Sequence, residues 1–127
     1  MVFSSFLLIY IEVFKLKFSD SLKKTKDFSQ VYNKGKSLAD HNLVLYIYEN
    51  DSDTNRLGIS VSKKVGNSVV RHHLTRLIRE SYRLHEDMFR PGLDLVVVVR
   101  KAGKNCTYEE ICNSLLKLAN LHNVIRK

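Results

Sequence analysis

The segment LDLVVVVR at residues 93–100 constrains the fold more strongly than any other part of the chain. Pro91 and Gly92 precede it, and both residue types interrupt regular structure. Apolar residues, four of them consecutive valines, fill nearly every position and remove the alternation expected of a strand with one face in water, so the run predicts a strand covered on both faces. The chain has 127 residues, enough for one compact domain in which helices cover such a strand.

The other elements follow from periodicity and capping residues. Alternating apolar residues predict strands over 42–48 and 56–64. Helical spacing predicts three helices: one over 25–34, begun by Thr25 or Asp27 and ended by Gly35; one over 68–88, capped by Asn67; and one opened by the capping box of Thr107 and Glu110. The order αββαβα predicts a small single domain of the α+β class.

Positive charge is concentrated in one part of the chain. The net charge is +8 and the pI is about 9.6. Residues 54–83 hold seven Lys or Arg side chains against one acid, Glu80. A helix that is merely solvated mixes both signs of charge, so this excess indicates a polyanionic partner, either nucleic acid or an acidic membrane surface.

The helix over 68–88 has an apolar face and a basic face. At about 100° per residue, one arc is apolar or small and is predicted to face the core: Val70, Leu74, Leu77, Ile78, Ser81, Leu84 and Met88. The opposite side carries Arg71, His72, Arg76, Arg79 and Arg83. Guanidinium groups donate paired hydrogen bonds to phosphate. The turn from Lys63 to Asn67 adds two lysines and the free amides of a helix N-terminus, which also favour anions.

Strand residues that are not needed for the main core form a second candidate surface. Val44, Tyr46, Ser60 and Ser62 would line a shallow trough, bordered by Phe28 and Tyr32 of the first helix. Aromatic rings in such a trough offer surfaces on which unpaired bases stack. A small second core between that helix and the sheet is the alternative explanation for Phe28. From the residues alone, the pattern favours single-stranded RNA over duplex DNA.

Several other classes of protein fit poorly. Residues 1–16 are apolar but too short for a membrane span and lack a signal peptide's charged start, so we expect a loosely packed extension or a misplaced start codon. Contact of this segment with a membrane is the alternative. Cys106 and Cys112 lack metal-ligand spacing, which favours reduced thiols. Acidic residues are scattered in predicted loops, so an autonomous protein nuclease is not supported.

The stretch SVSKKVGNSVVRHHLTRLIRE at 60–80 resembles the signature of the bacterial ribonuclease P protein component. The resemblance continues through residues 27–46, 93–103 and 107–110. It implies an αβββαβα two-layer sandwich over residues 17–127, similar to the second domain of ribosomal protein S5. It also implies a cytoplasmic RNA-binding subunit that assists a catalytic RNA in removing the 5′ leader from precursor tRNA. Hydrolysis and its Mg²⁺ would belong to the RNA, with no cofactor, membrane or small-molecule substrate bound by the protein.

The resemblance also assigns roles to residues. Positions that match the family's surface for the catalytic RNA are Lys63, Lys64, Gly66, Arg71, Arg76 and Arg79, and we add Asn67, His72 and His73. Phe28, Tyr32, Val44 and Tyr46 match its leader-binding cleft, to which we add Ser60 and Ser62. The chain departs from the family where His72, His73 and Thr75 replace the usual Asn, Arg and Lys. A non-catalytic RNA-binding module of a ribosomal or translation-factor type remains the alternative.

Overall fold

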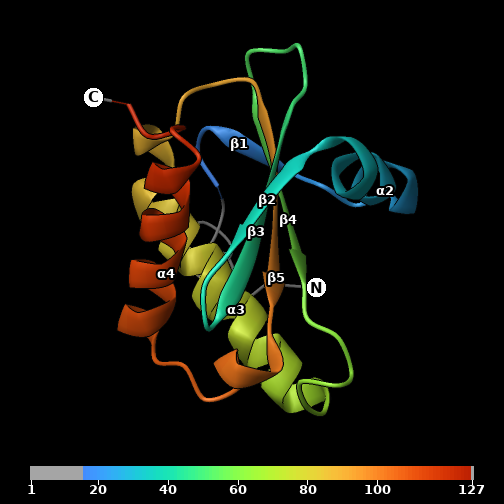
Figure 1. The fold of residues 1–127 in the computed structure, drawn as a ribbon, viewed down its shortest axis with the longest axis vertical. Helices are drawn as coiled ribbons and strands as arrows, with labels where there is room; N and C mark the ends of the chain where they lie inside the picture. The colour runs from blue at the N-terminus through green and yellow to red at the C-terminus, as the bar shows by residue number, and fades with distance from the viewer. Residues whose placement is uncertain (1–15, 127) are drawn as a thin grey trace, which may run out of the picture.

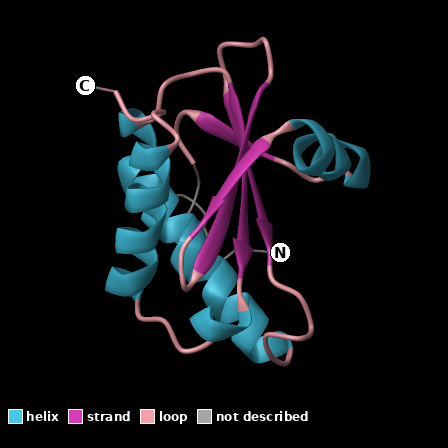
Figure 2. Ribbon diagram, viewed as in Figure 1, coloured by secondary structure: helices cyan, strands magenta, loops and turns pink. Residues whose placement is uncertain are grey.

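The computed structural model describes residues 16–126, which form one mixed five-stranded sheet with helices on both faces (Figures 1 and 2). The strands are β1 (Ser19–Ser21), β2 (Lys36–Ala39), β3 (Leu43–Glu49), β4 (Asn55–Ser60) and β5 (Leu93–Val99). The helices are α2 (Thr25–Lys34), α3 (Ser68–His85) and α4 (Tyr108–Leu121), with 3-10 turns at Glu86–Met88 and Lys101–Gly103. The α+β prediction is confirmed.

The valine-rich strand lies in the middle of the sheet, as its sequence predicts. The strand order is β1-β4-β5-β3-β2, with β5 parallel to β4 and antiparallel to β3. Six of its seven residues are buried, and only Val98 retains partial exposure. Such a strand must be apolar on both faces because each face is covered by other side chains.

The two faces of the sheet support two separate cores. Helices α3 and α4 cover one face, while α2 crosses the other (Figure 1). The main core joins Leu43, Leu45 and Leu57 of the sheet to the apolar sides of α3 and α4. The smaller core contains Leu22, Val31 and Val96, with the ring of Phe28 packed against it. The position of α2 therefore depends on few apolar contacts.

The predicted caps are correct for two helices and wrong for one. The Oδ1 atom of Asn67 accepts a hydrogen bond of 3.0 Å from the amide of Val70. The capping box of Thr107 and Glu110 is complete. Helix α2, in contrast, begins after Lys24 without a side-chain cap. Asp27 is drawn instead into an ion pair with a neighbouring strand, so neither residue proposed as its cap serves that role.

Gly35 follows the last residue of α2, as predicted. Its backbone is not left-handed, so another property of glycine is needed at this position. Its φ is −79°, which any residue can adopt. A Cβ atom at this position would lie 2.5 Å from the carbonyl oxygen of Val31 and 2.8 Å from that of Ile47. Glycine is required because α2 turns into β2 directly against the backbone of β3.

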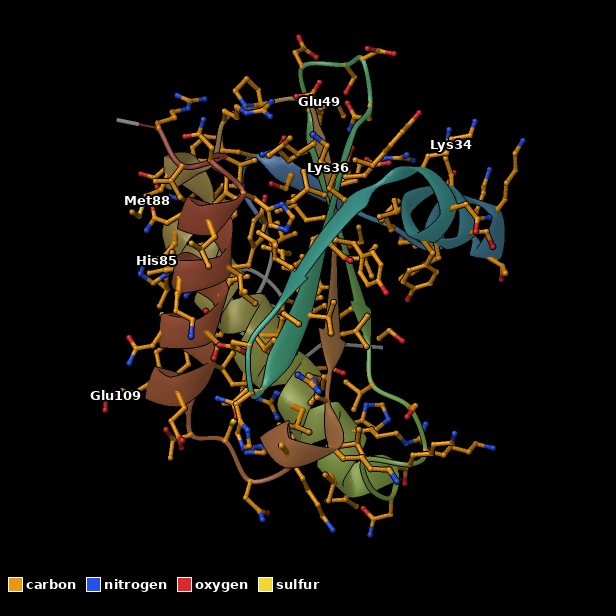
Figure 3. All side chains as sticks on the ribbon, in the orientation of Figure 1. Lys34, Lys36, Glu49, His85, Met88 and Glu109 are labelled. Carbon is orange, nitrogen blue, oxygen red and sulfur yellow. The ribbon has the colours of Figure 1, made fainter. Side chains whose placement is uncertain are left out.

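Helix α3 ends earlier than its periodicity predicts. The regular helix stops at His85 and a 3-10 turn follows, which contains Met88 (Figure 3). Met88 is 40% exposed, and Leu84 in the last turn of the helix is 51% exposed, although both were predicted to face the core. The buried stripe runs through Tyr82, whose ring packs edge-on against Phe89 with centroids 5.2 Å apart. Tyr82 and Phe89 are thus the buried side chains at this end of the main core, where the periodicity predicts Leu84 and Met88.

Short strands account for the other differences. Strand β4 ends at Ser60, earlier than the predicted residue 64, because the chain turns at Lys63 to enter α3. Strands β1 and β2 have three and four residues, too few for an alternating pattern to be recognised. β2 supplies the third strand that the family resemblance implies before α3, and β1 adds a parallel strand at the edge beside β4.

The described chain begins inside the core. Leu16, which we assigned to the N-terminal extension, is 8% exposed and belongs to the main core. The buried carboxylate of Glu86 accepts hydrogen bonds from the amides of Lys17 and Phe18, at 3.0 and 2.7 Å. The rest of the predicted extension lies outside the described residues. Within residues 16–126, no helix has the length and apolar character needed to cross a membrane.

Candidate nucleic-acid interface

The predicted trough lies on the face of the sheet that α2 crosses. Because side chains alternate along each strand, the pairing register decides which residues share this face. Two cross-strand rows form the floor: Ser60, Val98 and Val44 in one, and Gly58, Val96 and Tyr46 in the next. Strand pairing thus brings together three of the predicted trough residues: Val44, Tyr46 and Ser60. Ser62 is exposed two residues beyond the end of β4 and is not part of the sheet.

Three aromatic rings form a continuous wall along this floor. The centroids of Phe28 and Tyr32 are 6.3 Å apart, and those of Tyr32 and Tyr46 are 4.9 Å apart in an edge-to-face arrangement. Phe28 lies over Gly58, where a Cβ atom would come within 2.7 Å of its ring. Phe28 therefore packs against the smaller core, and its ring also extends the row formed by Tyr32 and Tyr46. Tyr32 is 39% exposed, and Tyr46 is half-buried.

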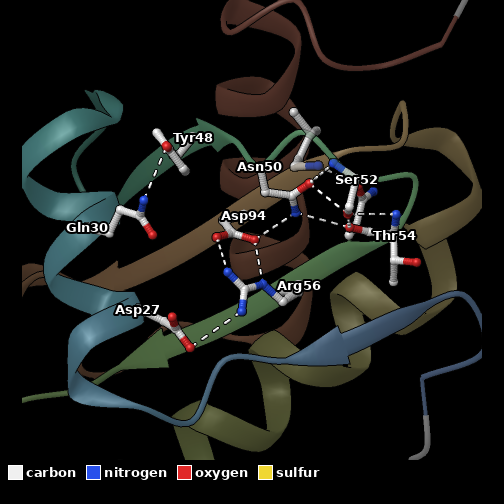
Figure 4. Close-up of polar contacts among 10 residues, drawn as sticks. Asp27, Gln30, Tyr48, Asn50, Ser52, Thr54, Arg56 and Asp94 are labelled. Atoms are coloured by element: carbon white, nitrogen blue, oxygen red, sulfur yellow. Dashed lines mark hydrogen bonds and ion pairs between the residues drawn. The ribbon is translucent and has the colours of Figure 1, made fainter.

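A polar network fixes the start of α2 beside the trough (Figure 4). The carboxylate of Asp94 is fully buried and binds Arg56 through two hydrogen bonds, of 2.8 Å from Nε and 2.6 Å from Nη2. Nη1 of Arg56 lies 3.4 Å from Asp27 of α2, and the Asn50 amide donates to Asp94 at 2.8 Å. The hydrogen bond to Asp94 raises the pKa of the Arg56 guanidinium above its usual value.

This network was not predicted from the sequence. Arg56 and Asp94 are separated by 38 positions and become neighbours only through the parallel pairing of β4 and β5. An isolated Asp inside the valine run was the available signal, because a buried carboxylate needs a charged or hydrogen-bonding partner. The result is a rigid anchor that positions the aromatic wall of α2 against the sheet.

The turn before α3 presents cations around a helix N-terminus. Lys63 and Lys64 are exposed, whereas Val65 between them and the helix is buried and anchors the turn in the main core. A Cβ atom at Gly66 would lie 2.8 Å from the Val70 side chain, so a small residue lets the turn pass close to the helix. The first turn of α3 contains no acidic residue. The dipole of the helix and the two lysines therefore favour an anion at the same end.

The basic side chains of α3 differ in their availability. His72, His73 and Arg76 are exposed, and Arg71 is half-buried. The Nε atom of Arg71 is buried without a hydrogen-bond partner among residues 16–126. The guanidinium of Arg83, by contrast, is bound to Glu80 at 3.0 and 2.6 Å, and this bond raises its pKa. The charge of Arg83 is thus neutralised within α3 itself.

Arg79 points toward the edge of the sheet. Its Nη1 atom donates to the hydroxyl of Ser21 in β1 at 3.3 Å. Thr75, which stands where the family usually has Lys, donates its hydroxyl to the backbone oxygen of Arg71 at 2.8 Å. The basic face of α3 therefore extends from the turn at Lys63 to the strand at the edge of the sheet.

The trough and the basic face lie on opposite sides of the sheet. They approach one another at the end of β4, where the chain passes from Ser60 through Lys63 into α3 (Figure 1). Aromatic rings and cations are suited to binding unpaired bases and phosphates. The described part of the chain contains no group of three or more His, Cys, Asp or Glu side chains placed to hold a metal ion.

Comparisons with known proteins identify the family of this chain. The ribonuclease P family model matches residues 16–122. The ribonuclease P protein component of Lachnoclostridium phytofermentans is 54% identical over 107 residues, covering 84% of this chain and 92% of the relative. That of Clostridium novyi is 49% identical over 113 residues, covering 85% of this chain and all of the relative.

Solved structures have the same fold. The RNase P protein of Staphylococcus aureus superposes with a TM-score of 0.78 at 38% identity, covering 85% of this chain and 99% of that one. The RNase P protein of Thermotoga maritima gives a TM-score of 0.72 at 31% identity, covering 78% of this chain and 94% of that one. The match of sequence and fold leads to one conclusion: this chain belongs to the family of bacterial ribonuclease P protein components.

Proposed function

We propose that this chain is the RNA-binding subunit of a ribonuclease P ribonucleoprotein and that it binds two RNAs at once. The arrangement of its two surfaces carries the proposal: a basic helix and an aromatic trough lie on opposite faces of one sheet and meet at the end of β4. A catalytic RNA held on one face and a substrate held on the other are thereby kept at a fixed separation. Fixed positioning of reactants lowers the entropy cost of reaction.

The catalytic RNA occupies the basic face in this proposal. Its phosphates contact the turn and the first two thirds of α3 through Lys63, Lys64, Gly66, Asn67, Arg71, His72, His73, Arg76 and Arg79. The partnerless Nε atom of Arg71 supports this role because a phosphate oxygen would satisfy it. Such contacts position an RNA but do not read its sequence.

The 5′ leader of precursor tRNA occupies the trough. Its bases stack on Phe28, Tyr32 and Tyr46, above a floor that includes Val44 and Ser60, and Ser62 extends the surface beyond the strand. Stacking accepts any base, so the trough suits leaders of differing sequence. The short side chain of Ser60 leaves room above the end of β4 for a strand of RNA, whereas the space over Gly58 is filled by the ring of Phe28.

Cleavage belongs to the RNA subunit in this proposal. The metal ions are Mg²⁺ held by the catalytic RNA, and the protein's part is to hold the leader and shield phosphate charge near the site. The compartment is the cytoplasm. A ribosomal or translation-factor module, the alternative considered above, would need the basic helix but not an aromatic trough beside it.

Precursor-tRNA cleavage at low Mg²⁺ tests the proposal. The cognate catalytic RNA is assayed with wild-type protein, with the Arg71→Ala/Arg76→Ala variant, and without protein. We expect the wild type to stimulate cleavage and the double variant to lose most of this stimulation. The slope of log affinity for the catalytic RNA against log salt should fall by about 2, one unit for each phosphate contact.

A second double variant controls for net charge. Arg90→Ala/Arg126→Ala removes the same charge at the other end of the molecule, where the backbone amides of these two residues bond to Val124 and Met88. It should stimulate cleavage as the wild type does. No stimulation by folded wild-type protein would refute the proposal, and cleavage by the protein alone would indicate a catalytic site of its own.

A further inference from the structure

A second aromatic and basic site lies at the β1 edge of the sheet, away from the trough. A hollow of about 810 Å³ opens there between β1 and α3. Its lining includes Lys17, Phe18, Ser21, Lys23 and Arg79. Three of these five residues are cationic, and one is an aromatic ring.

Phe18 is the unusual member of this group. Its side chain is 65% exposed and belongs to neither core. The backbone beneath it is nevertheless fixed, because the amides of Lys17 and Phe18 both donate to the buried carboxylate of Glu86. An exposed ring on an anchored backbone has little entropy to lose on binding and offers an apolar face next to positive charge.

Hydrogen bonds fix the wall of the hollow in the same way. The hydroxyl of Ser19 lies 2.7 Å from the hydroxyl of buried Tyr82 and donates to Glu86 at 3.2 Å. The Ser21 hydroxyl accepts from Arg79 at 3.3 Å, which holds one guanidinium over the strand. Asp20 also lines the hollow, but it is paired with Arg56 in the strand register and shares the face of the sheet on which Arg56 lies. The surface that faces α3 is left with an excess of positive charge.

We infer that this hollow binds one unpaired nucleotide of the catalytic RNA, with the base stacked on Phe18 and the flanking phosphates held by Lys17, Lys23 and Arg79. The inference rests on the proposed function and extends it. The catalytic RNA is chosen over the leader because Arg79 joins the hollow directly to the basic face of α3. The leader trough lies on the opposite face of the sheet.

The affinity of the protein for its cognate catalytic RNA tests this site. Phe18→Ala should weaken binding by about 5- to 150-fold, the range for one base stacked on an aromatic ring. Leu121→Ala is the matched control, because Leu121 on α4 is 64% exposed but lies outside the hollow. It should bind as the wild type does. Phe18→Tyr should also bind as the wild type does because the ring is kept.

A spectroscopic measurement separates stacking from a general loss of structure. The chain contains no tryptophan, so Phe18→Trp places a single tryptophan at the site, which can be excited selectively over the six tyrosines. Catalytic RNA should quench its emission, and a single-stranded leader oligonucleotide should not. Quenching by the leader alone would overturn the choice of RNA. Wild-type affinity in Phe18→Ala, with cleavage still stimulated by the wild-type protein, would overturn the site while leaving the proposed function intact.

Discussion

The pairing of Arg56 with Asp94 illustrates how much one buried charge determines locally. Asp94 interrupts a strand that is otherwise apolar and is completely buried. A carboxylate in that position is tolerated only because Arg56 and Asn50 satisfy both of its oxygens. The same guanidinium also forms an ion pair with Asp27. The side chain that neutralises Asp94 of β5 therefore also holds α2 in its position.

Arg56→Ala is expected to be strongly destabilising. Removing one member of a buried pair leaves an uncompensated charge, which costs about 3–5 kcal/mol. The matched variant is Arg90→Ala, which breaks the exposed ion pair with Glu49 and should cost no more than about 1 kcal/mol. Urea unfolding of both variants measures the difference. Equal losses of unfolding free energy would show that the Asp94 network does not have the role that we assign to it.

At the scale of elements, the long periodic helices and strands could be predicted from the sequence, whereas the contacts between residues of different elements could not. The apolar patterns of β3, β5, α3 and α4 are long enough to indicate both the type of element and its buried face. β1 and β2 are too short for an alternating pattern to be recognised. The end of regular α3 at His85 lies beside the contact between Tyr82 and Phe89, which no local pattern indicates. The aromatic wall was predicted by residue type, but its support by Gly58 depends on the register between strands.

Gly58 is expected to determine how closely α2 approaches the sheet. In Gly58→Ala, the new methyl group would meet the ring of Phe28 at 2.7–2.8 Å, and the ring must move. We expect a stability loss of about 1–3 kcal/mol and weaker binding of leader-containing precursor. Ser60→Ala, on the same face of the same strand, should be close to wild type in stability.

A double-mutant cycle isolates the contact. Because Phe28→Ala removes the obstructing ring, the loss in Gly58→Ala/Phe28→Ala should be smaller than the sum of the two single losses. Thermal or urea unfolding of the four proteins provides the comparison. Additive losses would mean that the Gly58 methyl acts on something other than this ring.

At the scale of the whole molecule, the sheet is a partition between two kinds of surface. The face that α2 crosses carries aromatic rings, and α3 on the other face carries four arginines against one acid, Glu80. The sequence indicated both surfaces and the residue types in each. Their placement on opposite sides could not be read from it, because it depends on the order of strands in the sheet.

The partition predicts that the two binding activities are separable. Tyr46→Ala should leave affinity for the catalytic RNA unchanged and weaken holoenzyme binding to a precursor with a long leader, by about 1–3 kcal/mol for one stacked base. A precursor with a one-nucleotide leader should be unaffected. Arg76→Ala should show the opposite pattern in direct binding to the catalytic RNA, with Tyr46→Phe as the control that keeps the ring. Similar losses by both variants in both assays would contradict a two-sided subunit.

The strand order has a consequence for how the chain is made. β5 lies in the centre of the sheet, yet it is the last strand to leave the ribosome. Before it appears, the pair of β1 with β4 and the hairpin of β2 with β3 have no strand between them, and each pair presents an unpaired inner edge. The sheet therefore closes late and largely in one step, through contacts between residues far apart in the sequence. During most of its synthesis the nascent chain exposes strand edges that favour aggregation, and a valine-rich segment near its C-terminal end completes the fold.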